Sequence, residues 1–197
     1  PLGGIGKRFI DFGYKVPKPL IKIFGDEIIN KVISSLKITQ NDRIYILYNP
    51  DLDLYNFESR VLAKNNKINF FKLPKQTAGP VETINIFCKL IKDEQINESV
   101  FILDGDVFFT YDVLSVLRDV NKNSILYFLN YEKKPIYSYI EINKKQKVLN
   151  VAEKIKISDN ANIGYFFKDF DTLKKFFFIT IKKSKKSYVS DVFKVML

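Results

Sequence analysis

The chain has 197 residues, a formal net charge of +10, a single Cys and no His, and its length predicts one domain with a sizeable core. The missing His excludes Ser-His-Asp and Cys-His triads and imidazole-bound zinc, and the lone Cys88 excludes an intramolecular disulfide, which favours a reducing compartment. Only four of the 32 basic residues are Arg, whose planar guanidinium binds phosphates and guanine edges better than the ammonium of Lys does. We therefore expect no nucleic-acid partner.

Apolar, β-branched runs alternate with segments of helical spacing along the chain. We expect strands at 44–48, 68–73, 100–103 and 125–129, and helices at 27–36, 54–64, 81–91 and 111–120. Two further strands, at 137–142 and 148–152, are joined by a turn at 143–147, which indicates an antiparallel section. The alternation predicts an α/β fold, namely a Rossmann-like three-layer α/β/α domain with a mixed, mostly parallel central sheet.

The two ends and the apolar runs bear on domain organisation and location. We expect residues 1–197 to be a single domain that is truncated at both ends. A doubly wound fold needs a buried strand before the opening glycine-rich turn, and the sequence ends, at 192–197, within an apolar helix face. The apolar runs are short, as at 176–181, well below the roughly 20 residues that span a bilayer, and no basic-then-apolar signal opens the sequence. We therefore expect a cytoplasmic protein with no membrane partner.

We interpret the lone cysteine and the lysine-rich segment as structural features without a functional role. Cys88 lies on the apolar face of its expected helix, so we interpret it as a small buried hydrophobe rather than a reactive thiol. The densest basic segment is interpreted as a solvated loop, and its lysines are Lys182, Lys183, Lys185 and Lys186, with Lys174 and Lys175 nearby.

The first segment that suggests chemistry is a glycine-rich turn followed by Arg8. Gly3, Gly4 and Gly6 let the backbone take positive φ and approach a ligand closely, so that successive N–H groups can point at phosphate oxygens. Arg8, just after the turn, could neutralise a leaving polyphosphate. An ordinary strand-to-helix turn explains the glycines equally well, and the segment matches neither the phosphate loop nor the dinucleotide fingerprint.

Two further segments add a cation and two carboxylates. Pro17 and Pro19 are expected to keep Lys18 in extended backbone as a fixed cation, although an exposed lysine between two prolines is the simpler alternative. Asp104 and Asp106 directly follow the expected strand at 100–103, and ligands of open α/β sheets bind outside the carboxyl ends of strands. A carboxylate there could hold Mg²⁺ on the phosphates of a nucleotide, and we expect one of the two aspartates to cap the following segment instead.

In this order, the segments resemble the sugar-nucleotide pyrophosphorylases, or sugar-1-phosphate nucleotidyltransferases. The pattern of that family is Gly-Gly-x-Gly-x-Arg, Pro-Lys-Pro-Leu, an apolar strand ending in Gly-Asp, Glu-Lys, Asn-x-Gly and a Tyr-x-x-Asp helix. This sequence matches it at 3–8, 17–20, 105–106, 153–154, 162–164 and 188–191, so the resemblance covers essentially the whole chain. The most similar subgroup serves capsule, lipopolysaccharide and other surface-glycan pathways.

The resemblance implies an Mg²⁺-dependent enzyme that condenses a nucleoside triphosphate with a sugar 1-phosphate, or a related phosphorylated small molecule, and releases pyrophosphate. It leaves open whether the chain forms a homo-oligomer. The implied catalytic residues are Arg8, Lys18 and Asp106, with Asp106 as the Mg²⁺ ligand. The implied nucleotide-binding residues are Leu2, Gly3, Gly4, Gly6, Gln76, Gly79 and Asp104, and the implied sugar-phosphate-binding residues are Glu153, Lys154, Asn162 and Gly164.

The sequence departs from the family pattern in three places. Ile155 follows Glu-Lys where the family usually has Pro, and the loop at 75–80 is atypical, which leaves the nucleotide open. The second metal-binding Asp of the family lies downstream of the Tyr-x-x-Asp helix, beyond Leu197.

Two alternatives from other classes remain. A metal-dependent glycosyltransferase would use Asp104-Gly105-Asp106 to hold a nucleotide sugar, but such enzymes generally lack the glycine-rich turn and Pro-Lys-Pro. A catalytically silent regulatory module would bind nucleotide or sugar phosphate without turnover.

Overall fold

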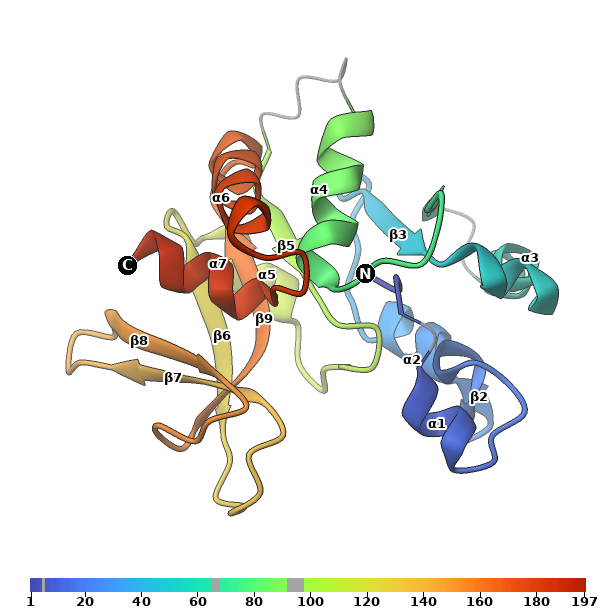
Figure 1. Ribbon diagram of the computed structural model, residues 1–197, viewed down its shortest axis with the longest axis horizontal. Coiled ribbons are helices and arrows are strands. Elements are labelled where there is room, and N and C mark those ends of the chain that lie inside the picture. The colour runs from blue at the N-terminus through green and yellow to red at the C-terminus, as the bar shows by residue number, and fades with distance from the viewer. Residues whose placement is uncertain (5, 65–67, 92–97) are drawn as a thin grey trace. The chain divides into compact units, whose positions relative to one another are not determined.

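A computed structural model describes the chain except for residues 5, 65–67 and 92–97 and the side chains of Lys7 and Arg8. The chain divides into two compact units (Figure 1). Unit 1 comprises Pro1–Ala78 and Asp104–Val120, and unit 2 comprises Gly79–Leu103 and Asn121–Leu197.

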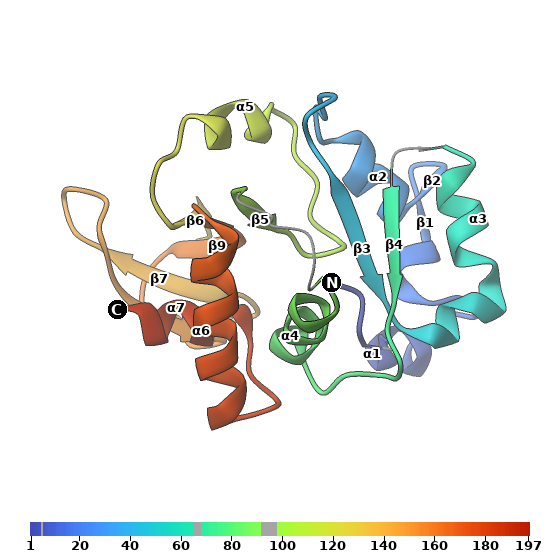
Figure 2. The same cartoon turned by 90° about the horizontal axis from the view of Figure 1, so that it is seen from above.

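Unit 1 is built around the parallel pair of strands β3 and β4, which Figure 2 shows side by side. Ile44 lies opposite Ile68 and Tyr48 opposite Lys72, and Leu2 adds a parallel bridge to Tyr48. The elements of this unit are α1 (Lys7–Asp11), η1 (Lys18–Leu20), β1 (Lys22–Ile23), β2 (Asp26–Glu27), α2 (Ile28–Ser34), β3 (Ile44–Tyr48), η2 (Pro50–Tyr55), α3 (Phe57–Leu62), β4 (Ile68–Lys72) and α5 (Val113–Arg118).

The core of unit 1 is aromatic where β3 meets α3. The rings of Tyr48 and Phe57 lie 5.3 Å apart between centroids, and Phe70 packs edge-on against both. The buried Tyr48 hydroxyl donates to the carboxylates of Asp53 at 3.0 Å and Glu58 at 2.5 Å. Burial, followed by these two carboxylates, raises the pKa of Tyr48, so the hydroxyl stays protonated and fixes η2 and α3 to the strand.

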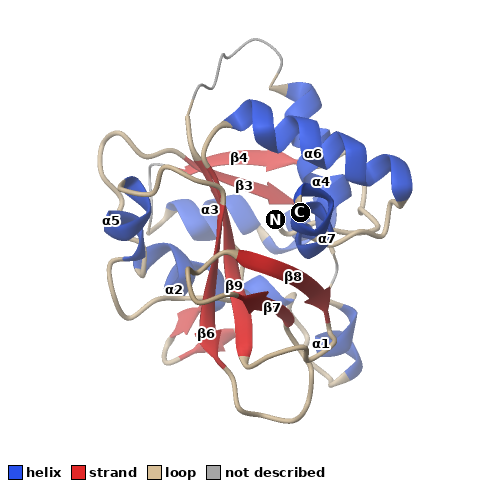
Figure 3. Cartoon of the chain, turned by 90° about the vertical axis from the view of Figure 1, so that its left-hand side faces the viewer, coloured by secondary structure: helices blue, strands red, loops and turns tan. Residues whose placement is uncertain are grey.

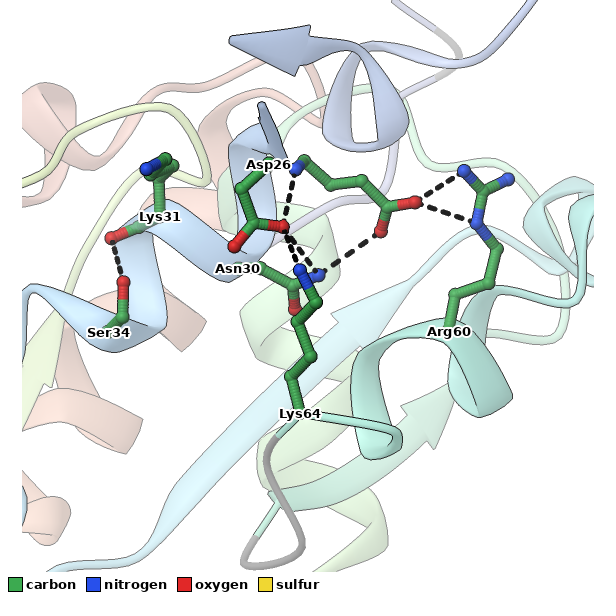
Figure 4. Close-up of polar contacts among 7 residues, drawn as sticks. Asp26, Asn30, Lys31, Ser34, Arg60 and Lys64 are labelled. Carbon is green, nitrogen blue, oxygen red and sulfur yellow. Dashed lines mark hydrogen bonds and ion pairs between the residues drawn. The ribbon is translucent and has the colours of Figure 1, made fainter. Parts of the chain in front are cut away.

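A polar cluster joins the start of α2 to α3 (Figure 4). The Glu27 carboxylate is only 10% exposed; it forms an ion pair with Arg60 and accepts a hydrogen bond from Asn30 Nδ2 at 3.2 Å. Asp26 accepts from Lys64 Nζ at 2.6 Å, and this contact is the main cause that lowers the pKa of Asp26. Since Arg60 lies beside Glu27, that carboxylate can be nearly buried without becoming an unpaired ion, while Lys64 stays in solvent.

In its described residues, unit 2 has a five-stranded antiparallel sheet and three helices. The strand order is β5-β9-β7-β8, and β6 pairs with β9 as well. The elements are α4 (Pro80–Leu90), β5 (Val100–Ile102), β6 (Ser124–Leu129), β7 (Ser138–Ile142), β8 (Val148–Glu153), β9 (Asn160–Phe167), α6 (Phe170–Lys183) and α7 (Val189–Met196).

The helices of unit 2 lie together beside its sheet (Figure 3). Phe167 of β9 is fully buried and contacts Phe177 of α6 and Phe193 of α7, with ring centroids 5.8 and 5.0 Å apart. Asp169 caps α6 by accepting from the Thr172 N–H at 2.6 Å. A capped, amphipathic helix with Phe on one face therefore covers the last strand.

The mixed α/β class is confirmed, and the expected strands at 44–48, 68–73, 100–103, 125–129, 137–142 and 148–152 are found within one or two residues at each end. Among the described pairings, only β3–β4 and the Leu2 bridge are parallel. The short pair β1–β2 and all strand pairs of the sheet in unit 2 are antiparallel. The expected helix at 54–64 is interrupted at Asn56, whose φ of 53° separates η2 from α3. Within the described ranges, every helix is too short or too polar to cross a lipid bilayer.

Candidate functional site

The glycine-rich turn is attached to the edge of β3 in unit 1. The Leu2 N–H donates to the Leu47 carbonyl at 2.6 Å, and the Leu2 carbonyl accepts from the Asn49 N–H at 3.0 Å. The Gly3 carbonyl accepts from the Thr77 N–H at 3.3 Å. The backbone polar groups of Leu2 are thus used within the unit, whereas Gly4 is exposed and no heavy atom lies within 4 Å of the position a Cβ would take.

Gly6 is the position where the turn requires glycine. Its φ is +66°, and a Cβ would lie 3.3 Å from the Lys18 Cβ. Another residue there would have both a strained backbone and a tight contact with Lys18. α1 begins at the next residue; Arg8 lies in its first turn, and the Arg8 side chain is outside the described residues.

Lys18 reaches the aspartates from η1. The expectation of extended backbone at this residue is wrong: Pro17 is extended, with ψ of 150°, and Lys18 begins the 3-10 helix. A proline at the following position is compatible with the first turn of a helix because its missing N–H would have no partner there. The Lys18 ammonium forms an ion pair with Asp106 and lies 5.5 Å from the Phe9 ring centroid.

Asp104 and Asp106 flank a glycine on which Leu2 packs. A Cβ at Gly105 would overlap the Leu2 side chain, so this glycine allows the acidic segment to lie against the glycine-rich turn. Desolvation by the surrounding protein raises the pKa of Asp104, and the negative charge of Asp106 acts in the same direction. The Lys18 ammonium opposes both. Two carboxylates and one ammonium therefore share one corner of unit 1.

The two residues proposed to contact the base belong to different units. Gln76 is an exposed residue of unit 1. Gly79, in unit 2, is the N-cap of α4, and its φ of −177° is ordinary extended backbone. A Cβ there would lie 3.0 Å from the Ser187 carbonyl, so Gly79 lets the loop at 184–187 pack closely on the start of α4.

The Glu-Lys pair at the end of β8 is held by the first turn of α7. The Lys154 Nζ donates to the Tyr188 hydroxyl at 3.0 Å and lies 4.7 Å from the centroid of that ring. Lys154 has a φ of 54°, which is uncommon for a residue other than glycine. Glu153 Oε2 accepts from Ser190 Oγ at 2.8 Å. The carboxylate and ammonium thus project from one strand end and are both fixed by α7.

Tyr188 and Ser190 are contacts that the sequence analysis missed. The signal was present in the Tyr-x-x-Asp motif, whose Asp191 carboxylate accepts from the Tyr188 N–H at 2.8 Å and closes a capping box on α7. That box sets the first turn of the helix, which presents both side chains to the end of β8.

Asn162 and Gly164 lie on β9, where each has a structural role. Asn162 Nδ2 donates to Ser138 Oγ at 3.1 Å, and Asn162 Oδ1 accepts from the Gly164 N–H at 3.0 Å. Gly164 is buried, and a Cβ would come within 2.6 and 2.8 Å of two atoms of the Phe101 ring. The Asn-x-Gly segment of this chain therefore serves hydrogen bonding and close strand packing, whatever else it does.

The chain matches a known sequence family and a curated protein. The sequence model of the family described as nucleotidyl transferase matches residues 2–197. The bifunctional protein GlmU of Methanococcus aeolicus is 24% identical over 159 residues, which are 78% of this chain and 34% of that protein. The chain thus spans about a third of the length of that curated relative.

Solved structures share the fold at low identity. The nucleoside-diphosphate-sugar pyrophosphorylase from Vibrio cholerae superposes with a TM-score of 0.80 at 17% identity, covering 98% of this chain and 84% of that one. The inositol-1-phosphate CTP transferase from T. maritima gives a TM-score of 0.72 at 16% identity, covering 96% and 76%. At these identities, the likeness establishes the fold.

Proposed function

The chain belongs to the nucleotidyl transferase family, and from this premise we propose that it condenses a nucleoside triphosphate with a sugar 1-phosphate, or a similar phosphorylated acceptor, to give a nucleoside-diphosphate product and pyrophosphate. The observation that carries the proposal is the corner of unit 1 where Gly6, Lys18 and Asp106 meet, since the Cβ of Lys18 lies against Gly6 of the glycine-rich turn and its ammonium forms an ion pair with Asp106. Backbone N–H donors and a cation suit the oxygens of a polyphosphate, and a carboxylate suits the metal ion that accompanies one.

The proposed reaction needs no covalent nucleophile. An oxygen of the acceptor's phosphate forms a bond to the α-phosphorus, and the bond from that phosphorus to the oxygen bridging the α- and β-phosphates breaks. The electron pair leaves with pyrophosphate. Because phosphoryl groups repel nucleophiles through their own negative charge, alignment and charge neutralisation supply the catalysis. Lys18 and Arg8 would neutralise the departing pyrophosphate, and the turn at Gly3–Gly6 would bind the nucleotide phosphates.

The acidic corner suits a magnesium ion that is shared with substrate. Asp106 and Asp104 would supply one or two carboxylate oxygens, and Mg²⁺ in such sites takes its other ligands from phosphates and water. Among the described residues, no group of three or more His, Cys, Asp or Glu could form an all-protein metal site. When bound, the ion neutralises phosphate charge.

Unit 2 would supply the acceptor side. The Lys154 ammonium, steadied by Tyr188, suits the phosphate of the acceptor, and the Glu153 carboxylate suits a hydroxyl donor such as a sugar or polyol. Asn162 and Gly164 would shape this segment through β9. The names of the structural neighbours include both sugar and inositol phosphates, which supports a small phosphorylated polyol as acceptor. A role in surface-glycan synthesis is part of the proposal.

The test compares turnover in two site variants and a matched control. Lys18→Met and Asp106→Ala each remove one charge contact and are expected to lower kcat at least about a hundredfold, equivalent to about 3 kcal/mol of transition-state stabilisation. Lys72→Met breaks the exposed ion pair with Asp53, at 3.1 Å, in the same unit and should leave kcat within about twofold. Near-normal turnover of Asp106→Ala, with an unchanged melting temperature in all three variants, would refute the assignment.

A further inference from the structure

The loop between α6 and α7 in unit 2 has a fixed conformation with lysines around a cavity. The Ser184 N–H donates to the Thr180 carbonyl at 3.2 Å and ends α6, and Ser187 Oγ donates to the Ser184 carbonyl at 2.7 Å. The Lys186 N–H donates to Ser184 Oγ at 3.2 Å. On the far side, the Val81 N–H donates to the Ser187 carbonyl at 3.4 Å. The loop backbone is thus tied to itself and to α4. The lysines of the basic segment are exposed, as a solvated segment requires, but Lys182 and Lys183 belong to the last turn of α6.

A cavity of about 560 Å³ opens between this loop, the end of α6 and α7. Its charged and hydroxyl lining comprises Lys183, Lys186, Lys194, Ser184, Ser187 and Asp191, along with Thr180. The three lysines come from three different segments of the chain, namely the last turn of α6, the loop and the second half of α7. Their convergence is therefore a product of the fold and does not follow from the lysine-rich run alone.

The cavity has an unbalanced positive charge. Asp191 is its one carboxylate, and that carboxylate already accepts the Tyr188 N–H in the capping box. In the part of unit 2 that the structure describes, lysine ion pairs are formed by Lys156 and Lys174, and none involves the three lysines of the cavity. Ammonium groups brought together without counter-charges attract an anion, and several at once attract one with several charges.

We propose that this cavity is a second anion site that takes a polyphosphate chain, as in a nucleoside di- or triphosphate. Lysine ammonium groups bind phosphate oxygens as point charges, and hydroxyls such as that of Ser184 can donate to the same oxygens. The cavity is larger than the space that a single phosphate occupies, so its volume favours a chain of phosphoryl groups. None of its residues belongs to the proposed catalytic or acceptor-binding set, so the site stands independently of the proposed reaction.

The probe is inorganic tripolyphosphate with a chelator present, titrated calorimetrically into the full-length protein. One variant carries Lys183→Gln, Lys186→Gln and Lys194→Gln. Its matched control carries Lys144→Gln, Lys145→Gln and Lys147→Gln, which make the same charge change in the exposed turn between β7 and β8 of the same unit. All six lysines are exposed, so both variants are expected to fold, and their melting temperatures without ligand confirm it.

Every protein compared carries Lys18→Gln, which weakens the polyphosphate site proposed in unit 1, and this parent protein should still bind tripolyphosphate at the cavity. The cavity variant should bind tripolyphosphate at least tenfold more weakly than the parent, and the control variant should bind within about twofold of it. Equal affinity of the cavity variant and the parent would overturn the proposal. So would equal losses in both triple variants, which would indicate non-specific attraction, or complete loss of binding in Lys18→Gln.

Discussion

The close packing of Gly164 against Phe101 gives the sharpest prediction about the fold of unit 2. In Gly164→Ala, the new methyl group would lie 2.6 and 2.8 Å from two atoms of the Phe101 ring and 3.5 Å from the Ile102 carbonyl oxygen. Since Gly164 is buried and directly precedes Tyr165, where β5 pairs with β9, either the Phe101 ring must turn out of its present position or β5 must shift. Overpacking of this kind costs about 1–3 kcal/mol of unfolding free energy.

For a chain of this length, that cost lowers the melting temperature by about 2–4 °C per kcal/mol. Thermal and urea unfolding followed by circular dichroism measure the loss. Gly4→Ala is the control, because no heavy atom lies within 4 Å of its Cβ position and the change should stay within about 0.5 kcal/mol. Adding Phe101→Leu to Gly164→Ala should recover part of the lost stability. Unaltered stability of Gly164→Ala, or no recovery in the double variant, would refute the packing argument.

Two other predictions concern the interior of each unit. Arg60→Leu leaves the nearly buried Glu27 carboxylate without its cation and should destabilise the protein by about 2–3 kcal/mol in urea unfolding. Adding Glu27→Gln removes the stranded charge, so a double variant as unstable as Arg60→Leu would contradict this account. Burial raises the pKa of Cys88 to about 12, so at pH 8 the native protein should carry about a thousandfold less thiolate than a free cysteine. Iodoacetamide labelling should accordingly be slow at pH 8 and rise about tenfold per pH unit. If Cys88 were labelled as rapidly in the native protein as in the unfolded chain, this prediction would be wrong.

Local patterns predicted most elements of this protein because their periodicity is strong. The run Ile44–Tyr48 is apolar throughout and becomes β3 at the expected residues, and the turn at 143–147 joins β7 to β8 as expected. The break at Asn56 does not follow from apolar spacing, because it lies in the left-handed backbone conformation of that one residue, which periodicity does not report.

The site was predictable as a set of motifs but not as a set of contacts. The ion pair between Lys18 and Asp106 joins residues that are 88 positions apart, and no local pattern indicates that they meet. The same holds for Lys154 and Tyr188, where the motif fixed the first turn of α7 but not the side chain that the tyrosine would contact. Strand pairing was only partly predictable. The alternation of apolar strands with helices indicated a mostly parallel sheet, which holds for β3 and β4, whereas the sheet of unit 2 is antiparallel.

The central claim is transfer of a nucleotidyl group, and the fate of labelled phosphates tests it most directly. The full-length protein is incubated with Mg²⁺ and each nucleoside triphosphate, labelled at the α- or the γ-phosphate, against sugar 1-phosphates, inositol 1-phosphate and phosphocholine. The account predicts that the α-label appears in a product containing the acceptor, that the γ-label appears in pyrophosphate, and that both require the acceptor and Asp106. Nucleotide binding without any transfer of the α-label across this panel would contradict it.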